Sequence, residues 1–538
     1  MADGTAEANT TGEGPIKDSG QARLEQLGYK QELSRTLSLL VNVALGYGTM
    51  SILMSNTGLY GLGFTYGGPV TIIWGWLVVS FFVLCIAVSM GMLCSSFPTA
   101  GGLYFWSYSL AGPKYGPLCA WFTVWFNYLG DVLGMAVVNY VGATILATMV
   151  VIASGEGGGV EGGAYVATKG VMVAFAGGLY ILQVAVNVFD VRVLAFFGKA
   201  GLVLEIVGLA VVIIALLAVS ERKQSADFVF THWEPATGLG IHSTFYIFLL
   251  GLLPACFTIN GFDAPAHMSE ETERSDRTAP LSIVVSVAVA VFTGFAFLLT
   301  LTFCIQDPAT LFDPGNATAG LSAGGQIFFD AFASRGYTHN ASVALLSLPL
   351  VSSFLGGMAL LAAMSRIMFA VSRDGALPFS AVLRLTSRTS HVPVVAVCVS
   401  AALSFSFVLF SLKSYVAFNA VTSAAQISAY LAYGTPILLR MLNPGAFVPG
   451  PFDMGKWSYV FGTISIAYIS FMCGVFCLPT VYPITSDTLN WAPVILASVI
   501  ILASVVWVTY SRDRYLSNRK GLVTPGNVGK AGLIDHKL

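Results

Sequence analysis

Residues 256–280 read CFTINGFDAPAHMSEETERSDRTAP, and this stretch decides the fold. It ends an apolar run that begins near Phe245, so a helix that crosses a membrane is expected there. The helix pattern is nevertheless broken by a cluster of poor helix formers and polar side chains: Asn260, Gly261, Asp263, Pro265 and His267. The stretch therefore predicts a membrane helix whose regular backbone is interrupted within the span.

The whole chain has the composition of a polytopic membrane protein. Of its 538 residues, 56% are hydrophobic and 10% are charged, and the mean hydropathy is +0.77. A soluble protein of this length needs far more charge on its surface. The net charge of −1 gives no reason to expect a nucleic-acid partner. The eight cysteines show no metal-ligand spacing, so no metal and no cofactor is expected.

The apolar pattern predicts an all-α fold with about twelve spans. They run over residues 36–62, 69–93, 117–152, 166–189, 194–219, 244–268, 279–306, 342–372, 393–412, 414–441, 457–479 and 490–510. The polar ends, 1–34 and 511–538, are expected to be cytoplasmic tails, the first of them disordered.

Lysine and arginine set the orientation. With both ends cytoplasmic, the inner loops and tails hold 21 of the 26 Lys and Arg residues and the outer loops hold 5. This asymmetry supports both the span count and cytoplasmic termini, and the plasma membrane is the expected location. Two sequons, at Asn316 and Asn340, fall in the longest outer loop, where glycosylation is possible.

The first span is interrupted like the sixth. Residues 44–61 read ALGYGTMSILMSNTGLYG, again rich in glycine and small polar residues. The two spans lie five apart, which indicates two inverted repeats, 35–220 and 221–441, followed by the two helices of 442–510. Broken backbone at membrane depth is tolerated where it lines a cavity or is buried in protein. The other interpretation is that the glycines only let helices pack closely.

Several motifs resemble one family in order and spacing. They are SSFPTAGGLYFWSYSLAGPKYGP (95–117), NGFDAPAHMSEETERSDRTAP (260–280), SRIMFAVSRDGALPFS (365–380), HVPVVA (391–396), AFNAVTSAAQISAYLAYGTPILLR (417–440) and FCLPTVYPITSDTLNWAPV (476–494). The chain is similar to the amino acid–polyamine–organocation (APC) superfamily, in the branch of fungal GABA and choline permeases and plant bidirectional amino acid transporters. The resemblance implies a LeuT-type fold of five plus five helices with two more, and alternating access with a small amine or amino acid substrate.

The resemblance also implies a binding site at the two breaks. The first break would meet the substrate carboxylate with Gly46, Gly48, Thr49, Met50 and Ser51. The sixth would meet the amine through Phe257, Thr258, Ile259, Asn260 and Gly261, with Phe257 matching an aromatic gate. Asp263 stands where the family more commonly has glutamate, and the resemblance makes it a candidate residue for coupling or gating.

Two carboxyl groups lie deep in other spans. We hypothesise that Asp131, with Asn127 one turn earlier, lines the substrate site and favours amines; a hydrogen bond to a neighbouring helix is the alternative. Glu205 is a candidate carrier of a coupling proton, or else a neutral structural hydrogen-bonding group. Ser352 and Ser353 stand near the hydroxyl ligands that Na⁺-coupled relatives use, although serines at such positions are often packing residues. The sequence leaves coupling to H⁺, to Na⁺ or neither open.

After the sixth span, the charges of SEETERSDR can form a cytoplasmic latch. Glu270, Glu271 and Arg274 could pair with one another or with Arg366, or could belong to a solvated loop.

The sequence thus predicts a secondary active transporter of amino acids or related amines such as GABA, ion-coupled or exchanging. Its partners would be that small substrate and the lipid bilayer. The alternatives are a choline or polyamine transporter and a non-transporting amino acid sensor of the same fold. The chain has no HExxH motif and no nucleophile–base set, so an enzyme is not expected.

Overall fold

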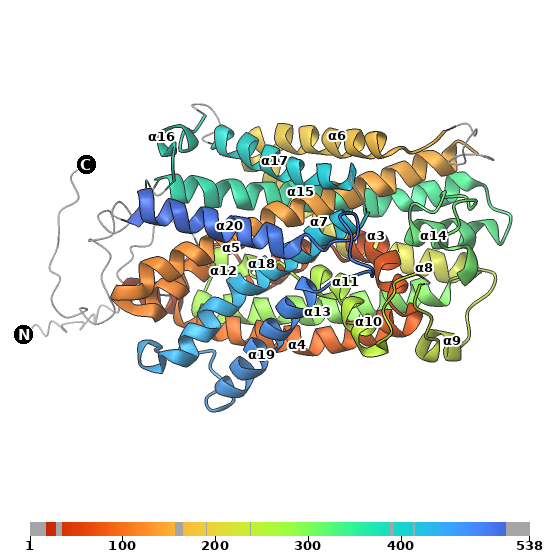
Figure 1. Ribbon diagram of the computed structural model, residues 1–538. Coiled ribbons are helices and arrows are strands. Elements are labelled where there is room, and N and C mark those ends of the chain that lie inside the picture. Colours follow the sequence, from red (N-terminus) through yellow and green to blue (C-terminus); the bar gives the residue numbers. More distant parts are fainter. Residues whose placement is uncertain are drawn as a thin grey trace, which may run out of the picture.

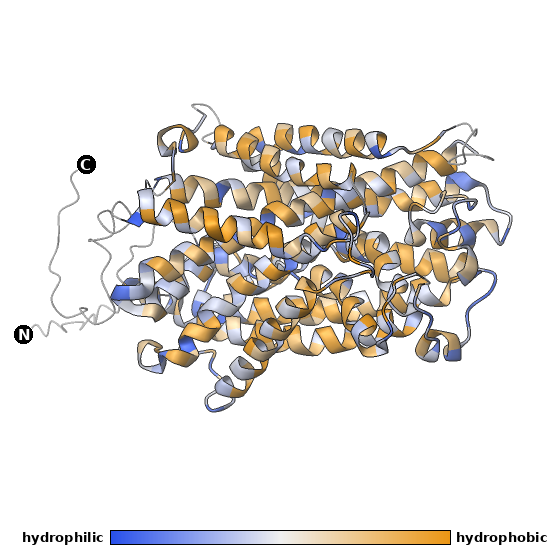
Figure 2. Ribbon diagram, in the orientation of Figure 1, coloured by the Kyte–Doolittle hydropathy of each residue, from blue (hydrophilic) through white to orange (hydrophobic). Residues whose placement is uncertain are grey.

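The computed structural model describes residues 18–27, 35–155, 165–189, 191–236, 238–373, 375, 377–387, 392–412 and 415–512. Within them the regular structure is helical, apart from one isolated bridge between Leu37 and Thr272. The helices form one elongated bundle, with α9 (Ala226–Thr231) and α14 (Ala323–Ala333) at one end and α16 (Ser380–Leu383) at the other (Figure 1). Hydrophobic residues dominate the sides of the bundle and polar residues gather toward its ends (Figure 2), as expected across a bilayer.

Ten helices in the described part of the chain are long and apolar enough to span a membrane. Eight of them are α4 (Gly68–Ser96), α5 (Gly102–Ala153), α6 (Lys169–Val188), α13 (Ser275–Phe303), α15 (His339–Arg373), α17 (Val394–Val408), α19 (Trp457–Cys477) and α20 (Ala492–Val506). The first span is α2 (Leu39–Met50) followed by α3 (Ile52–Thr65), and the fifth is α7 (Val191–Val203) followed by α8 (Leu209–Val219). The predicted all-helical membrane fold is confirmed.

The other two predicted spans differ from these ten for separate reasons. The sixth is divided into α10 (Thr244–Leu250), α11 (Leu253–Thr258) and α12 (Ala264–His267). The tenth, α18 (Tyr415–Leu442), has the length but is more polar. Its polar residues Asn419, Thr422 and Gln426 are buried, and α18 packs along α5 inside the bundle. Because such a helix shows little surface to lipid, it does not need an apolar exterior.

A shorter helical segment precedes the third span. Both belong to α5, which is divided by a kink at Gly112, whose φ of 72° is a value that suits glycine. The helix that contains the predicted span 117–152 therefore begins just after Gly112. Further along, Gly130 lets two backbones approach, since a Cβ there would lie 3.3 Å from the backbone nitrogen of Ala429 in α18. This contact fixes Asp131 against the centre of the bundle.

The fifth span carries an irregular turn. Between α7 and α8, residues Leu204–Gly208 form a π-helical turn. Such turns insert one extra residue into a helix and are frequent at functional sites. Glu205 lies in this turn and is 3% exposed.

The N-terminal tail, predicted to be disordered to residue 34, contains a helix, α1 (Ser19–Gln26). Asp18 caps it by accepting hydrogen bonds from the backbone nitrogens of Gly20 and Gln21. The Ser19 hydroxyl donates to Asp276 at 2.7 Å, and Leu24 is fully buried. These contacts hold α1 against the start of α13.

The two sequons of the outer loop have different environments. The side-chain amide of Asn316 is hydrogen-bonded within the loop. Its Nδ2 donates to the Thr310 carbonyl at 2.7 Å, and its Oδ1 accepts from the nitrogens of Thr318 and Gly320. Thr318 itself is fully buried. Asn340 lies exposed in the first turn of α15.

We therefore propose Asn340, and not Asn316, as the glycan acceptor. In a eukaryotic host, Asn340→Gln is expected to abolish the glycosidase-sensitive shift in gel mobility, whereas Asn316→Gln is expected to leave it unchanged. A shift that is lost only in Asn316→Gln would contradict the assignment.

Candidate functional site

The first break lies at Ser51. This residue has φ 43° and ψ 55°, a left-handed conformation that few non-glycine residues adopt, and it separates α2 from α3. Its hydroxyl donates to the carbonyl of Gly48 at 3.4 Å. A Cβ at Gly356 of α15 would lie 2.7 Å from the Ser51 Oγ, so α15 approaches the break closely. The break thus places the N-terminus of α3 inside the bundle, where Ile52 and Leu53 are fully buried.

The second break covers residues 259–263, between α11 and α12. Gly261 has φ 83°, and Pro254 and Pro265 lie in the first turns of the two half-helices. Proline suits that position because the nitrogen there needs no intrahelical partner. The backbone nitrogen of Gly261 donates to the hydroxyl of Tyr433 in α18 at 3.2 Å.

The two breaks touch each other. Thr49 Oγ1 lies 2.8 Å from the Gly261 carbonyl oxygen and 2.9 Å from that of Gly46, and it can donate to either. A Cβ at Gly46 would meet Ser286 at 2.8 Å and Pro265 at 3.0 Å, whereas one at Gly48 would meet nothing within 4 Å. Open space therefore adjoins the first break at Gly48.

The predicted substrate residues divide into two groups by exposure. Seven are partly exposed toward space in or around the bundle: Gly48, Thr49, Asn127, Asp131, Phe257, Asn260 and Gly261. Five are buried: Gly46, Met50, Ser51, Thr258 and Ile259. Thr258 donates to the Pro254 carbonyl at 2.8 Å, within its own half-helix. The partly exposed group is the better candidate for contact with a ligand.

Asp131 lies close to the sixth-span break. Its carboxyl group is near enough to Asp263 and His267 for their charges to act on it. Within the described residues no side chain donates a hydrogen bond to it. A carboxylate that is partly exposed and lacks a partner can receive an ammonium group from a ligand.

Asp263 is held by two residues that the sequence analysis did not single out for binding. Tyr433 donates to Asp263 Oδ1 at 3.0 Å, and His267 Nε2 lies 3.3 Å from Asp263 Oδ2. His267 is visible in the sequence as a polar residue of a membrane helix. Tyr433 carried no such signal, because a tyrosine in an apolar segment is unremarkable by itself.

Glu205 and Ser352, predicted separately, are joined in the structure. Ser352 donates to Glu205 Oε1, and the backbone nitrogen of Leu53 donates to Oε2 at 3.2 Å. The carboxyl group therefore caps the N-terminus of α3 just after the first break, where the helix dipole favours negative charge. Ser353 faces elsewhere and donates to the Val138 carbonyl of α5 at 2.8 Å.

The residues of the proposed latch make contacts of more than one kind. Glu270 accepts a hydrogen bond from the Ala100 nitrogen at 3.0 Å, and the Glu271 carbonyl accepts from the nitrogens of Thr36 and Leu37. Arg366 is near enough to Glu271 for an electrostatic interaction. The backbone nitrogen of Arg274 donates to Asp18 at 2.7 Å, and Asp18 also pairs with Arg35 at 3.5 Å. Backbone hydrogen bonds and ionic contacts thus meet at this surface, and the latch stays a proposal.

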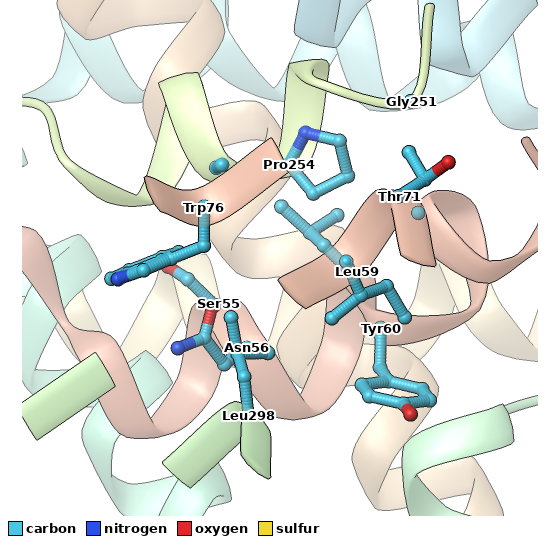
Figure 3. A pocket seen from close by; sticks show the side chains of 12 residues that line it. Ser55, Asn56, Leu59, Tyr60, Thr71, Trp76, Gly251, Pro254 and Leu298 are labelled. Atoms are coloured by element: carbon cyan, nitrogen blue, oxygen red, sulfur yellow. The ribbon is translucent and has the colours of Figure 1, made fainter. Parts of the chain in front are cut away.

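A separate small cavity of about 20 Å³ lies beside the outer half-helices, between α3, α4, α11 and α13 (Figure 3). Its lining includes Asn56 and Thr71, whose Nδ2 and Oγ1 atoms are buried without a hydrogen-bond partner. The cavity has room for about one water molecule. None of the predicted substrate residues lines it.

A family model described as amino acid permease matches residues 32–500. The chain belongs to the amino acid permease family. The permease is 38% identical to "Amino-acid permease BAT1" of Arabidopsis thaliana over 500 residues, which cover 93% of this chain and 96% of that protein. A homologue in Oryza sativa subsp. japonica is 38% identical over 508 residues, covering 94% and 96%. A Candida albicans protein named "Putative polyamine transporter" is 26% identical over 515 residues, covering 94% and 90%.

Family membership confirms the predicted superfamily and implies a LeuT-type fold. This fold agrees with the two broken spans, the first and the sixth, which lie five spans apart. The protein is a multi-pass membrane transporter of amino acids, and not an enzyme.

The backbone conformation at Gly261 requires a residue without a Cβ atom. Gly261→Ala is expected to destabilise the protein by about 1–2 kcal/mol, because φ is positive there. Gly474→Ala in α19 is the matched control, since its Cβ meets nothing within 4 Å and alanine favours a helix. Thermal unfolding of the two purified variants in detergent checks this, and an unchanged melting temperature for Gly261→Ala would contradict the assignment.

Proposed function

We propose that this permease moves amino acids or related amines such as GABA by alternating access, with the substrate held between the two breaks. The observation that carries the proposal is the contact of Thr49 with the Gly261 carbonyl, beside open space at Gly48. The substrate carboxylate is proposed to lie against the backbone of Gly48 and Thr49, because the Leu53 nitrogen at the start of α3 already donates to Glu205. Freed carbonyls of the sixth-span break suit an ammonium group.

Asp131 is the side chain proposed to select the amine. It lies partly exposed near the break, and no described side chain donates to it. A charge-assisted hydrogen bond to an ammonium group would fill that role. Asn127, one turn earlier on α5, is partly exposed as well and belongs to the same proposed face.

Removing the charge of Asp131 tests this role. Asp131→Asn is expected to reduce the affinity for amine-bearing substrates by about tenfold or more, because a hydrogen bond to a charged group is lost. Binding of labelled amino acids to purified protein provides the measurement. Asp227→Asn, in the outer helix α9, serves as control. An Asp131→Asn variant with unaltered amine preference would refute the role.

We further propose that Glu205 carries a coupling proton. The ionised carboxylate links the N-terminus of α3 to α15 through Leu53 and Ser352. Protonation removes the negative charge that the α3 N-terminus attracts and so weakens this link. A proton can thereby change how firmly the outer half of the first span is joined to the rest of the bundle. A sodium ion beside Ser352 and Ser353 is the other coupling proposal, although Ser353 already donates to α5.

Replacing the carboxyl group of Glu205 distinguishes coupling to protons from coupling to sodium ions. In liposomes, uptake by the wild type is expected to rise with an inward proton gradient, and Glu205→Gln is expected to lose that response while retaining exchange. Glu221→Gln, on an exposed outer residue, should behave as the wild type. Proton stimulation that persists in Glu205→Gln, or stimulation by a sodium gradient alone, would exclude the proton role.

The substrate class is tested with the same liposomes. A panel of labelled amino acids, GABA, choline and polyamines distinguishes the proposal from its rivals, since a fungal relative is named for polyamines. Binding without uptake of any of them would favour a sensor. We propose a plasma-membrane location with both termini cytoplasmic, supported by the 21 to 5 distribution of Lys and Arg.

A further inference from the structure

The imidazole of His267 lies between two hydrogen-bond acceptors. Nδ1 is 3.2 Å from the carbonyl oxygen of Ala100, and Nε2 is 3.3 Å from Asp263 Oδ2. A carbonyl oxygen can only accept, so Nδ1 carries a hydrogen. An ionised Asp263 also only accepts, so Nε2 must then carry a hydrogen too; otherwise Asp263 is itself protonated and donates to Nε2. In either arrangement the pair holds one proton more than a neutral imidazole beside a carboxylate.

The ring is closely packed and still reached by water. A Cβ at Gly102 would lie 2.8 Å from the Cε1 atom of His267, so the loop before α5 rests directly on the imidazole. The side chains of His267 and Asp263 are 31% and 12% exposed, respectively. A proton held by the pair therefore has a route to solvent.

The neighbouring groups favour positive charge on the ring. Tyr433 of α18 donates to Asp263 at 3.0 Å, and Asp131 of α5 acts on His267 through its charge. Glu270 accepts a hydrogen bond from the backbone nitrogen of Ala100, the residue whose carbonyl oxygen His267 contacts. Three helical elements pack on α12 in the described part of the chain. The first, α2 (LLVNVALGYGTM), carries no charged residue, α13 carries Asp276 and Arg277 in its first turn, and the short 3-10 helix Ser269–Glu271 carries Glu270 and Glu271.

We propose that Asp263 and His267 share one proton while α12 is docked on the loop at Ala100, and that His267 releases this proton to the cytoplasmic side when α12 moves away. The proposal rests on alternating access as proposed above, and it makes His267 a positioning residue of the inner gate. When the proton leaves Nε2 for water, the electron pair stays on the nitrogen and faces a carboxylate oxygen. Two acceptors then oppose each other, so the ring turns away from Asp263. Its Nδ1–H group leaves the Ala100 carbonyl with it, and that contact is the one that docks α12 on the loop.

The test varies the internal pH of liposomes between about 5.5 and 7.5, on either side of the ordinary imidazole pKa near 6.5, at constant external pH. His267→Gln keeps a polar side chain that does not titrate. The measurement uses a Glu205→Gln background, so that the proposed response of Glu205 to the proton gradient is absent. Exchange in this background is expected to change by up to about tenfold per pH unit on one side of the transition, and to stay constant after His267→Gln is added. His232→Gln is the matched control, because His232 also faces a carboxylate, Glu234 at 2.9 Å, in an exposed outer segment. Addition of His267→Gln that leaves the internal pH dependence of this background unchanged would overturn the proposal.

A second measurement needs no transport. Ala264 of α12 is half-buried, and Ala264→Cys in a background without the eight native cysteines gives one labelling site. Because maleimide reacts with the thiolate, labelling of any cysteine rises with pH, and the rate at Ala264→Cys is therefore divided by the rate of a free thiol at the same pH. This ratio is expected to rise with internal pH when His267 is present, and to be independent of pH with His267→Gln. A ratio that ignores pH in the presence of His267, or follows it equally in His267→Gln, would refute the gate. Since no substrate is required, this result stands apart from the outcome of the uptake panel.

Discussion

Backbone polar groups that lose their helical partners inside a bilayer must find others within the protein, and this constraint organises the centre of the permease. The two breaks free such groups at Gly261 and at the start of α3. The Gly261 nitrogen is bound by Tyr433, its carbonyl by Thr49, and the Leu53 nitrogen by Glu205. Each of these bonds comes from a different helix, so the breaks are held by the surrounding bundle and not by their own segments. A change of position at either break must therefore exchange these bonds for others.

Much of this architecture could be predicted from the sequence, because it rests on local pattern. The clusters of glycine and polar residues located both breaks, and apolar length located the spans. Partners far apart in the sequence could not be found in this way. Glu205 and Ser352 each attracted attention alone, one for its charge and the other for its hydroxyl, and only the fold brings them together. Tyr433 gave no signal, since its role depends on facing Asp263 across 170 positions.

The surface formed by α1 and the start of α13 shows a second limit of prediction from local sequence pattern. Residues 18–27 were expected to be disordered because they are polar and short of apolar residues. An ordered helix of eight residues forms there nevertheless, because its N-terminus is capped and its buried Leu24 packs on a surface that the rest of the bundle provides. Likewise, the charges of SEETERSDR suggested ion pairs or a solvated loop, but the backbone hydrogen bonds of Glu271 with Thr36 and Leu37 could not be predicted, because backbone atoms look alike in every sequence.

The π-turn at Leu204–Gly208 has a consequence for how this span is interpreted. One added residue rotates everything beyond it by about 100° relative to a continuous α-helix. The face that α7 turns toward its neighbours is consequently not the face on which α8 continues, and a helical wheel drawn across the whole span misassigns one half. Removing a single residue from this turn would restore regular geometry but would swing the buried Leu209, Val212 and Leu216 away from the interior. In this span the phase of the helix, as much as the identity of its residues, determines where Glu205 can reach.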